Sequence, residues 1–197
     1  MANTCNTIRG LQLDACSPNI GGIKNIWLAD YKEGAATITK GEGADKTDLV
    51  DGTVSTFDAD VQWKKYEMRK NTASMTSTLN NSTDGASYVT TELSMVFSRM
   101  EAQKRISIQA LAIGQCMAAV EDSNGTMWFL GADAPLTATA GAGETGTVKG
   151  DANRYTLTLT DESLGFPYTI DTAEADKIRG VTSTSTSTPS QSPSDSI

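Results

Sequence analysis

The stretch Ser87-Tyr88-Val89-Thr90-Thr91-Glu92-Leu93-Ser94-Met95-Val96-Phe97 gives the strongest structural signal in this 197-residue chain. Successive side chains of a strand point to opposite faces, so a half-buried strand shows a two-residue period. One face of this stretch carries Val89, Thr91, Leu93, Met95 and Phe97, and the other is mostly polar. The pattern predicts a long strand with one face on a core.

Shorter alternating or apolar runs flank this strand on both sides. Gly, Asn, Asp and Ser separate them, and Asn124-Gly125 in particular suits a hairpin turn because both residues tolerate positive φ angles. Neither face of 61–69 is cleanly apolar, which indicates an exposed edge or a face that meets another subunit. We read Ala140–Gly150 as a small-residue loop. The expected strands are Ile23–Tyr31, Ala36–Lys40, Val61–Arg69, Ala73–Leu79, Gln115–Glu121, Thr126–Leu130, Leu136–Thr139, Asn153–Thr160 and Phe166–Ile170.

One segment changes to a helical period. Residues 99–113 are expected to form the one substantial helix, ended by Gly114. Its expected buried stripe, with Leu111 and Met100 beside it, consists of Ala102, Ile106, Ala110 and Ile113. Ile108 lies off that stripe and is expected to touch a second surface.

These elements predict a mainly β fold with one α-helix, a β-sandwich or barrel with the helix packed on it. Residues 1–180 have the length of one domain. Residues 181–197 consist largely of Ser, Thr and Pro and form a C-terminal extension that buries too little apolar surface to fold alone.

The charge balance limits the possible partners. The chain has 16 Lys plus Arg and 24 Asp plus Glu, a formal net charge of -8. Such a balance disfavours binding to nucleic acid through its phosphates, but it suits a wall past which nucleic acid slides. An excess of acid that only keeps the protein in solution is the alternative.

The densest acidic segment is Gly41–Asp60, with Glu42, Asp45, Asp48, Asp51, Asp58 and Asp60. Its spacing lacks the D-x-[DN]-x-[DN]-G pattern of calcium loops, so no metal is expected there. A solvated loop is the simplest interpretation. A charged wall within an assembly is the alternative.

No catalytic constellation is visible. The chain has no His, and Cys5, Cys16 and Cys116 are too scattered for a zinc site, so we expect no enzyme, no cofactor and no metal. Cys116 is expected in the core, and Asp161-Glu162 and Glu121-Asp122 in solvated turns. Packing is the expected role of Trp27, Trp63 and Trp128. Without an apolar run that suits secretion or a membrane, we expect assembly in a cytoplasm and no membrane partner.

Six segments, taken in order, resemble the tail tube (major tail) proteins of tailed bacteriophages, especially those of Bacteroidetes phages and prophages. Their order and spacing carry the resemblance, and no single one is diagnostic. They cover most of the chain up to about residue 170 and are Ile20–Ala29, Lys64–Thr76, Leu93–Phe97, the expected helix to Gly114, Asp122–Gly131 and Tyr155–Thr160.

The resemblance implies a β-sandwich with a flanking helix, and a structural subunit of the virion tail. Six copies would form a ring whose strands join into an inner barrel, rings would stack, and DNA would pass through the lumen without specific binding. Other tail or neck proteins would be further partners. We expect Ala59–Asn80 to be the hairpin of the ring or stacking contact, and Gly41–Asp60 to face the lumen or the next ring.

Two alternatives stay open. The Ser/Thr-rich extension departs from the family pattern and leaves room for a neck, baseplate-proximal or tail-terminator ring. A soluble β-sandwich that binds carbohydrate or protein is the alternative from another functional class.

Overall fold

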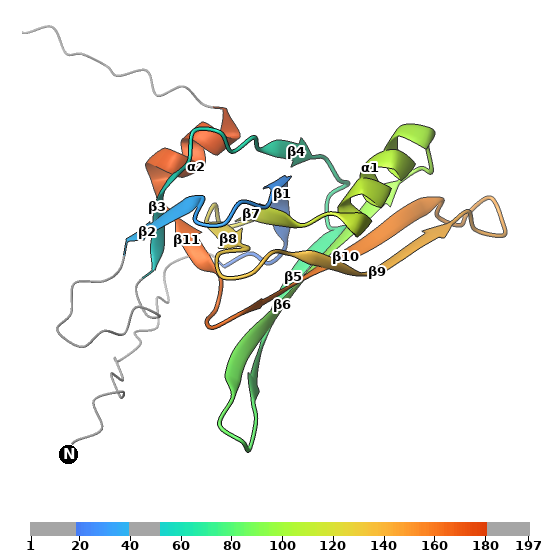
Figure 1. The fold of residues 1–197 in the computed structure, drawn as a ribbon. Helices are drawn as coiled ribbons and strands as arrows, with labels where there is room; N and C mark the ends of the chain where they lie inside the picture. The colour runs from blue at the N-terminus through green and yellow to red at the C-terminus, as the bar shows by residue number, and fades with distance from the viewer. Residues whose placement is uncertain (1–18, 40–51, 181–197) are drawn as a thin grey trace, which may run out of the picture.

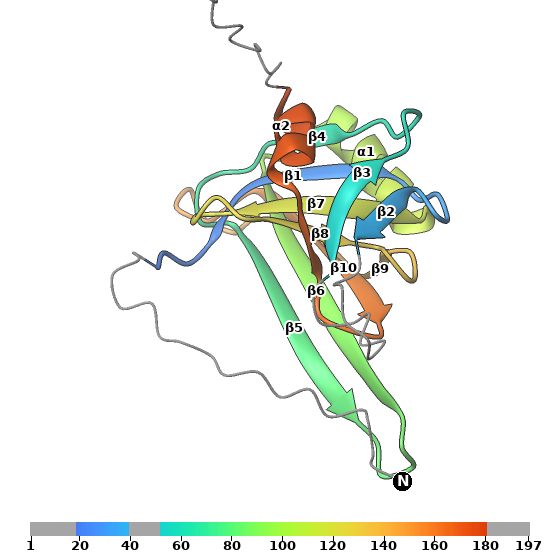
Figure 2. The same ribbon diagram turned by 90° about the vertical axis from the view of Figure 1, so that its left-hand side faces the viewer.

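The computed structural model describes residues 19–39 and 52–180. They form two packed β-sheets and two helices (Figures 1 and 2), so the expected mainly β fold with a flanking helix is confirmed. Sheet A has seven strands in the order β2-β3-β11-β8-β7-β1-β4. Their bounds are β1 Ile23–Asp30, β2 Ala36–Thr39, β3 Thr53–Phe57, β4 Lys64–Tyr66, β7 Cys116–Asp122, β8 Met127–Leu130 and β11 Tyr168–Ile170.

Sheet B has four strands in the order β5-β6-β10-β9, and every neighbouring pair is antiparallel. The strands are β5 Ala73–Asn81, β6 Ser87–Ser98, β9 Thr137–Glu144 and β10 Arg154–Ser163. The β5–β6 hairpin projects away from the rest of the molecule (Figures 1 and 2). Its tip therefore offers backbone and side chains that lie apart from the sandwich.

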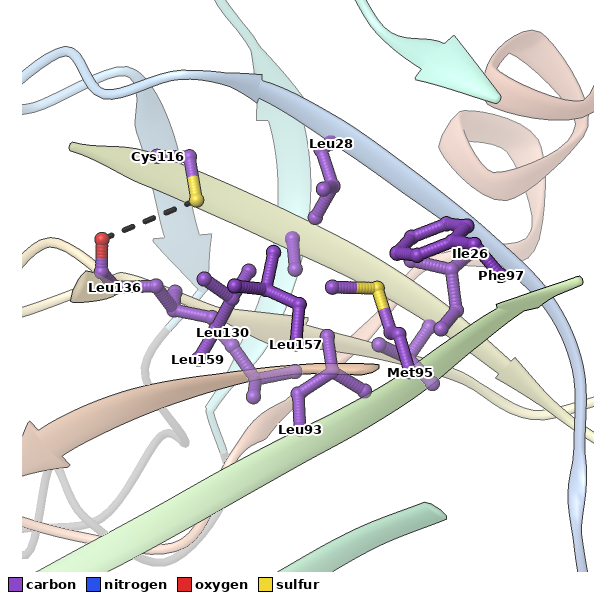
Figure 3. Packing of buried hydrophobic residues seen from close by; sticks show 12 residues of the cluster. Ile26, Leu28, Leu93, Met95, Phe97, Cys116, Leu130, Leu136, Leu157 and Leu159 are labelled. Atoms are coloured by element: carbon purple, nitrogen blue, oxygen red, sulfur yellow. Dashed lines mark hydrogen bonds between the residues drawn. The ribbon is translucent and has the colours of Figure 1, made fainter. Parts of the chain in front are cut away.

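The core between the sheets is formed by the alternating residues that the sequence predicts. Leu93 and Met95 of β6 and Leu159 of β10 are fully buried, and they meet Ile26 and Leu28 of β1 (Figure 3). Cys116 also belongs to this core, as expected. Its thiol donates to the Leu136 carbonyl oxygen over 3.8 Å, and burial raises its pKa to about 11.

A second core covers the other face of sheet A. Trp27, Met117 and Phe129 pack there against helix α2, Thr172–Arg179, which contributes Ala175 and Ile178. The central strands β1 and β7 are consequently buried on both faces, which agrees with the apolar character of both faces in the 23–31 segment.

Helix α2 was not expected from the sequence. It begins after Asp171, whose side chain accepts a hydrogen bond from the Ala173 N–H, and it ends at Gly180 with a φ of 77°. Both are standard capping signals, but the helix spans only eight residues with few apolar positions. Packing on sheet A therefore decides its formation.

Four other expectations were wrong in detail. Strand β3 lies inside the predicted loop 41–60, and residues 41–51 of that segment lie outside the described residues. The predicted strand 61–69 is confined to β4. The predicted loop 140–150 begins only after β9, which runs to Glu144. Residues 59–80 do not form a hairpin, because β4 pairs with β1 in sheet A whereas β5 pairs with β6 in sheet B.

Candidate assembly surfaces

The outer face of sheet B carries a dense set of hydroxyl groups. Its residues alternate with the buried ones, so they point away from the sandwich, and the strand register aligns them in rows such as Ser74, Ser94 and Thr158. We call this surface the hydroxyl face. It consists of Ser74, Thr76, Thr78, Thr90, Ser94, Thr139, Thr156, Thr158 and Thr160.

The charges on this face are few and mostly acidic. Glu92 and Glu162 lie among the hydroxyls and are exposed. At the end of the sheet, the Arg154 guanidinium pairs with Glu144 across β10 and β9. The two glutamates therefore give the middle of the hydroxyl face its negative charge.

Both edges of sheet B lack a neighbouring strand in the described part of the chain. These edges are β5 on one side and β9 on the other. Since each step across the sheet reverses direction, β5 and β9 run antiparallel to each other. A strand added to either edge would find unpaired backbone N–H and C=O groups.

Helix α1, Ala102–Ile113, lies against β9. Its orientation differs from the expected one: Ile108 and Leu111 pack on the core, whereas Ile106 and Ile113 are 56% and 81% exposed. The helix has apolar residues on two sides. The side with Ile108 and Leu111 packs against the core, and the side with Ile106 and Ile113 stays exposed. The expectation that Ile108 touches a second surface was therefore wrong as well.

A shallow groove of about 420 Å³ separates α1 from the β9 edge. Ile108 and Ala112 line it from the helix, and 138–143 line it from β9, where every residue is Ala, Gly or Thr. Small side chains let another chain approach the strand closely, so this edge is sterically open.

Two carboxylates expected in solvated turns are buried instead. Glu121 accepts hydrogen bonds from Asn25 Nδ2 over 2.6 Å and from Arg179 Nε over 3.1 Å. Asp161 accepts one from the Gly131 N–H over 3.2 Å, and its Oδ1 has no hydrogen-bond partner. Burial raises the pKa of Asp161 to about 6, with smaller contributions from Asp133 and Glu162.

Asp58 and Asp60, which end the acidic segment and lie within the described residues, form ion pairs with one lysine. Lys32 Nζ lies 2.8 Å from carboxylate oxygens of both Asp58 and Asp60. The hydrogen bond from Lys32 lowers the pKa of Asp60. No group of three or more His, Cys, Asp or Glu in 19–39 and 52–180 is arranged to hold a metal ion. The residues from Glu42 to Asp51 lie outside the described ranges.

The tryptophans take part in packing. Trp27 is buried in the second core, and Trp63 meets Phe57 edge to face with 5.1 Å between ring centroids. The Trp128 indole N–H donates to Asp122 Oδ2 over 3.1 Å. Across the described ranges, no helix is long and apolar enough to cross a bilayer.

No protein-family model, no curated protein and no solved structure matches this chain.

Proposed function

We propose that this protein is a structural subunit of a phage tail, which assembles through sheet B into rings that stack into a DNA-conducting tube. The observation that carries the proposal is the state of sheet B: two open edges, opposite in direction, and a polar face between them. Strand addition between copies is a common way of using such edges.

Joining of β9 of one copy to β5 of the next keeps the antiparallel alternation of strand directions. The combined sheet would continue in the same pattern from copy to copy, and a closed ring would leave no open edge in sheet B. A ring of six, as the resemblance to tail tube proteins implies, satisfies this requirement. Head-to-tail joining of this kind closes into a ring only if the rotations between successive copies add up to one full turn without a rise along the axis.

The hydroxyl face suits the lumen of such a ring. The neutral hydroxyl groups can form hydrogen bonds with passing DNA in place of water, but they do not attract its phosphates by charge. The carboxylates of Glu92 and Glu162 repel the phosphates. DNA would then move along the wall without sticking. The protein would be a virion component assembled in the host cytoplasm, with other tail or neck proteins at the ends of the tube.

Negative-stain electron microscopy of the purified protein across a concentration series tests this proposal. Stacked rings or tubes are the expected result. Single closed rings that never extend would assign the protein to a neck or tail-terminator ring, which needs the same lateral contact but no stacking. Monomers at all concentrations would overturn the proposal and favour a β-sandwich binding module.

A gel-shift measurement with double-stranded DNA tests the role of the lumen. Assembled rings should not retard linear DNA at physiological salt, since a tube wall has to release it. Tight, salt-sensitive binding would contradict a lumen lined by the hydroxyl face.

A further inference from the structure

The side of α1 that faces away from the core carries apolar residues that the described part of one copy leaves exposed. With about 100° of rotation per residue, Ile106 and Ile113 fall opposite the core-facing pair Ile108 and Leu111. Both isoleucines are more than half exposed. We call Ile106, Ala110 and Ile113 the outer stripe of α1.

The opposite edge of the sandwich has a hollow instead of a ridge. A groove of about 320 Å³ lies beside β5, between the start of β1 and the β7–β8 turn. Its apolar lining consists of Ile20, Ile23, Met75 and Trp128, of which Ile20 is 59% exposed. We call this the β5 groove.

Helix α1 and the β5 groove lie at the same level of sheet B. The register joins Gly141 of β9 to Leu157, Leu157 to Met95, and Met95 to Ala73 of β5 in one row. Gly141 lies in the α1–β9 groove, and Ala73 lies in the β5 groove. A continuous sheet that joins β9 to β5 of a second copy therefore brings α1 toward the β5 groove of that copy.

We propose that the outer stripe of α1 inserts into the β5 groove of a neighbouring copy of this chain, and so forms the apolar half of a lateral contact whose other half is the β9–β5 strand pair. This inference rests on the proposed function, because it requires copies to be joined through sheet B.

The charges beside the two surfaces are complementary. Arg105 is exposed next to Ile106, and the groove has Asp122 in its lining. In an antiparallel pair the end of β9 meets the start of β5. Glu144, at the end of β9, would therefore meet Arg69 and Lys70, which are exposed just before β5.

Ring closure staggers neighbouring strands by some residues. The contact tolerates this because the helix is about 18 Å long at 1.5 Å per residue. A stagger shifts which isoleucine enters the groove but does not separate the two surfaces.

Cysteine cross-linking and one charge substitution test the contact. In a background with Cys5→Ser and Cys16→Ser, which retains the buried Cys116, the pair Ile113→Cys and Ile20→Cys is treated with a short bismaleimide. Separately, Ile113→Glu is compared with Val148→Glu, a matched change at another exposed residue outside both surfaces. Circular dichroism and the thermal midpoint verify folding of each variant.

The expected result is a cross-linked ladder beyond the dimer, since a head-to-tail contact propagates, with no ladder from either single cysteine variant. Ile113→Glu should raise the protein concentration needed for assembly by about tenfold or more, and Val148→Glu should leave it unchanged. If Ile113→Glu assembles like the parent and the cysteine pair gives no ladder, the inference is overturned while the tube function stands. If the parent chain itself forms no rings or tubes, the proposed function fails, and the inference fails with it.

Discussion

Arg179, in the last turn of α2, donates from Nε to Glu121 Oε1 over 3.1 Å and so ties the last described helix to strand β7. The Glu121 side chain is only 4% exposed, and Asn25 Nδ2 occupies its other oxygen. Arg179 also donates to the Gly125 carbonyl oxygen and pairs with Asp176. This guanidinium therefore connects α2, β7 and the β7–β8 turn.

Replacing Arg179 should destabilise the fold markedly. In Arg179→Met the buried Glu121 carboxylate keeps, among the described residues, only Asn25 and the more distant Lys24, and loss of one partner of a buried ion pair costs about 3 kcal/mol. Chemical denaturation at neutral pH measures this cost. Arg99→Met, which removes an exposed cation whose partner Glu101 is also exposed, is the control and should cost less than about 1 kcal/mol. Equal effects of the two changes would contradict the connecting role of Arg179.

Asp161 should make stability depend on pH in mildly acidic solution. Its pKa in the folded protein is raised to about 6 from an ordinary value of 3.8. The folded state thus binds the proton more tightly, so the free energy of unfolding is highest below pH 3.8 for this group and falls as pH rises through 6. The expected loss is about 1–3 kcal/mol.

Asp161→Asn isolates this contribution. The amide oxygen still accepts from the Gly131 N–H, but the side chain does not ionise. The variant should be more stable than the parent at pH 7, and the difference should shrink between pH 6 and pH 4 in urea unfolding. A difference that is independent of pH would sink this account of the buried carboxyl.

Asp171 should be worth about 1 kcal/mol as the N-cap of α2, because its side chain accepts from the Ala173 N–H. Asp171→Ala should lower the free energy of unfolding by that amount, whereas Asp171→Ser should retain most of it. Thermal unfolding of the three proteins side by side gives the comparison. An alanine variant as stable as the parent would show that packing alone starts this helix.

The double variant Glu92→Lys, Glu162→Lys reverses the charge of the hydroxyl face. If that face lines a lumen, the assembled variant should retain double-stranded DNA at low salt and release it as salt rises. Glu67→Lys, at an exposed position beside β4, is the control that changes one charge in the same sense on sheet A. If the control retained as much DNA per reversed charge as the double variant, the result would argue against sheet B as the wall that faces DNA.

The resemblance to tail tube proteins predicted a β-sandwich with a flanking helix, and this level of the fold is confirmed. Strands with a clear period, such as 87–98 and 154–163, were predictable because alternation depends only on which face is buried. β3 was hidden because acidic residues surround it. α2 was hidden because eight residues with a low apolar content form a helix only when a sheet covers them.

The sequence by itself determined the long strands β6 and β10 of sheet B, since Leu93 and Met95, and likewise Leu157 and Leu159, alternate with residues of a more polar face, which permits one buried face only. The tertiary structure alone decided which side of α1 packs against the core, because Ile106 and Ile108 are equally apolar and only the position of the sheet distinguishes them. It likewise decided that β4 and β5, neighbours in the chain, belong to different sheets. The local sequence pattern specifies which face of a strand is buried, but the pairing of strands depends on contacts between residues far apart in sequence.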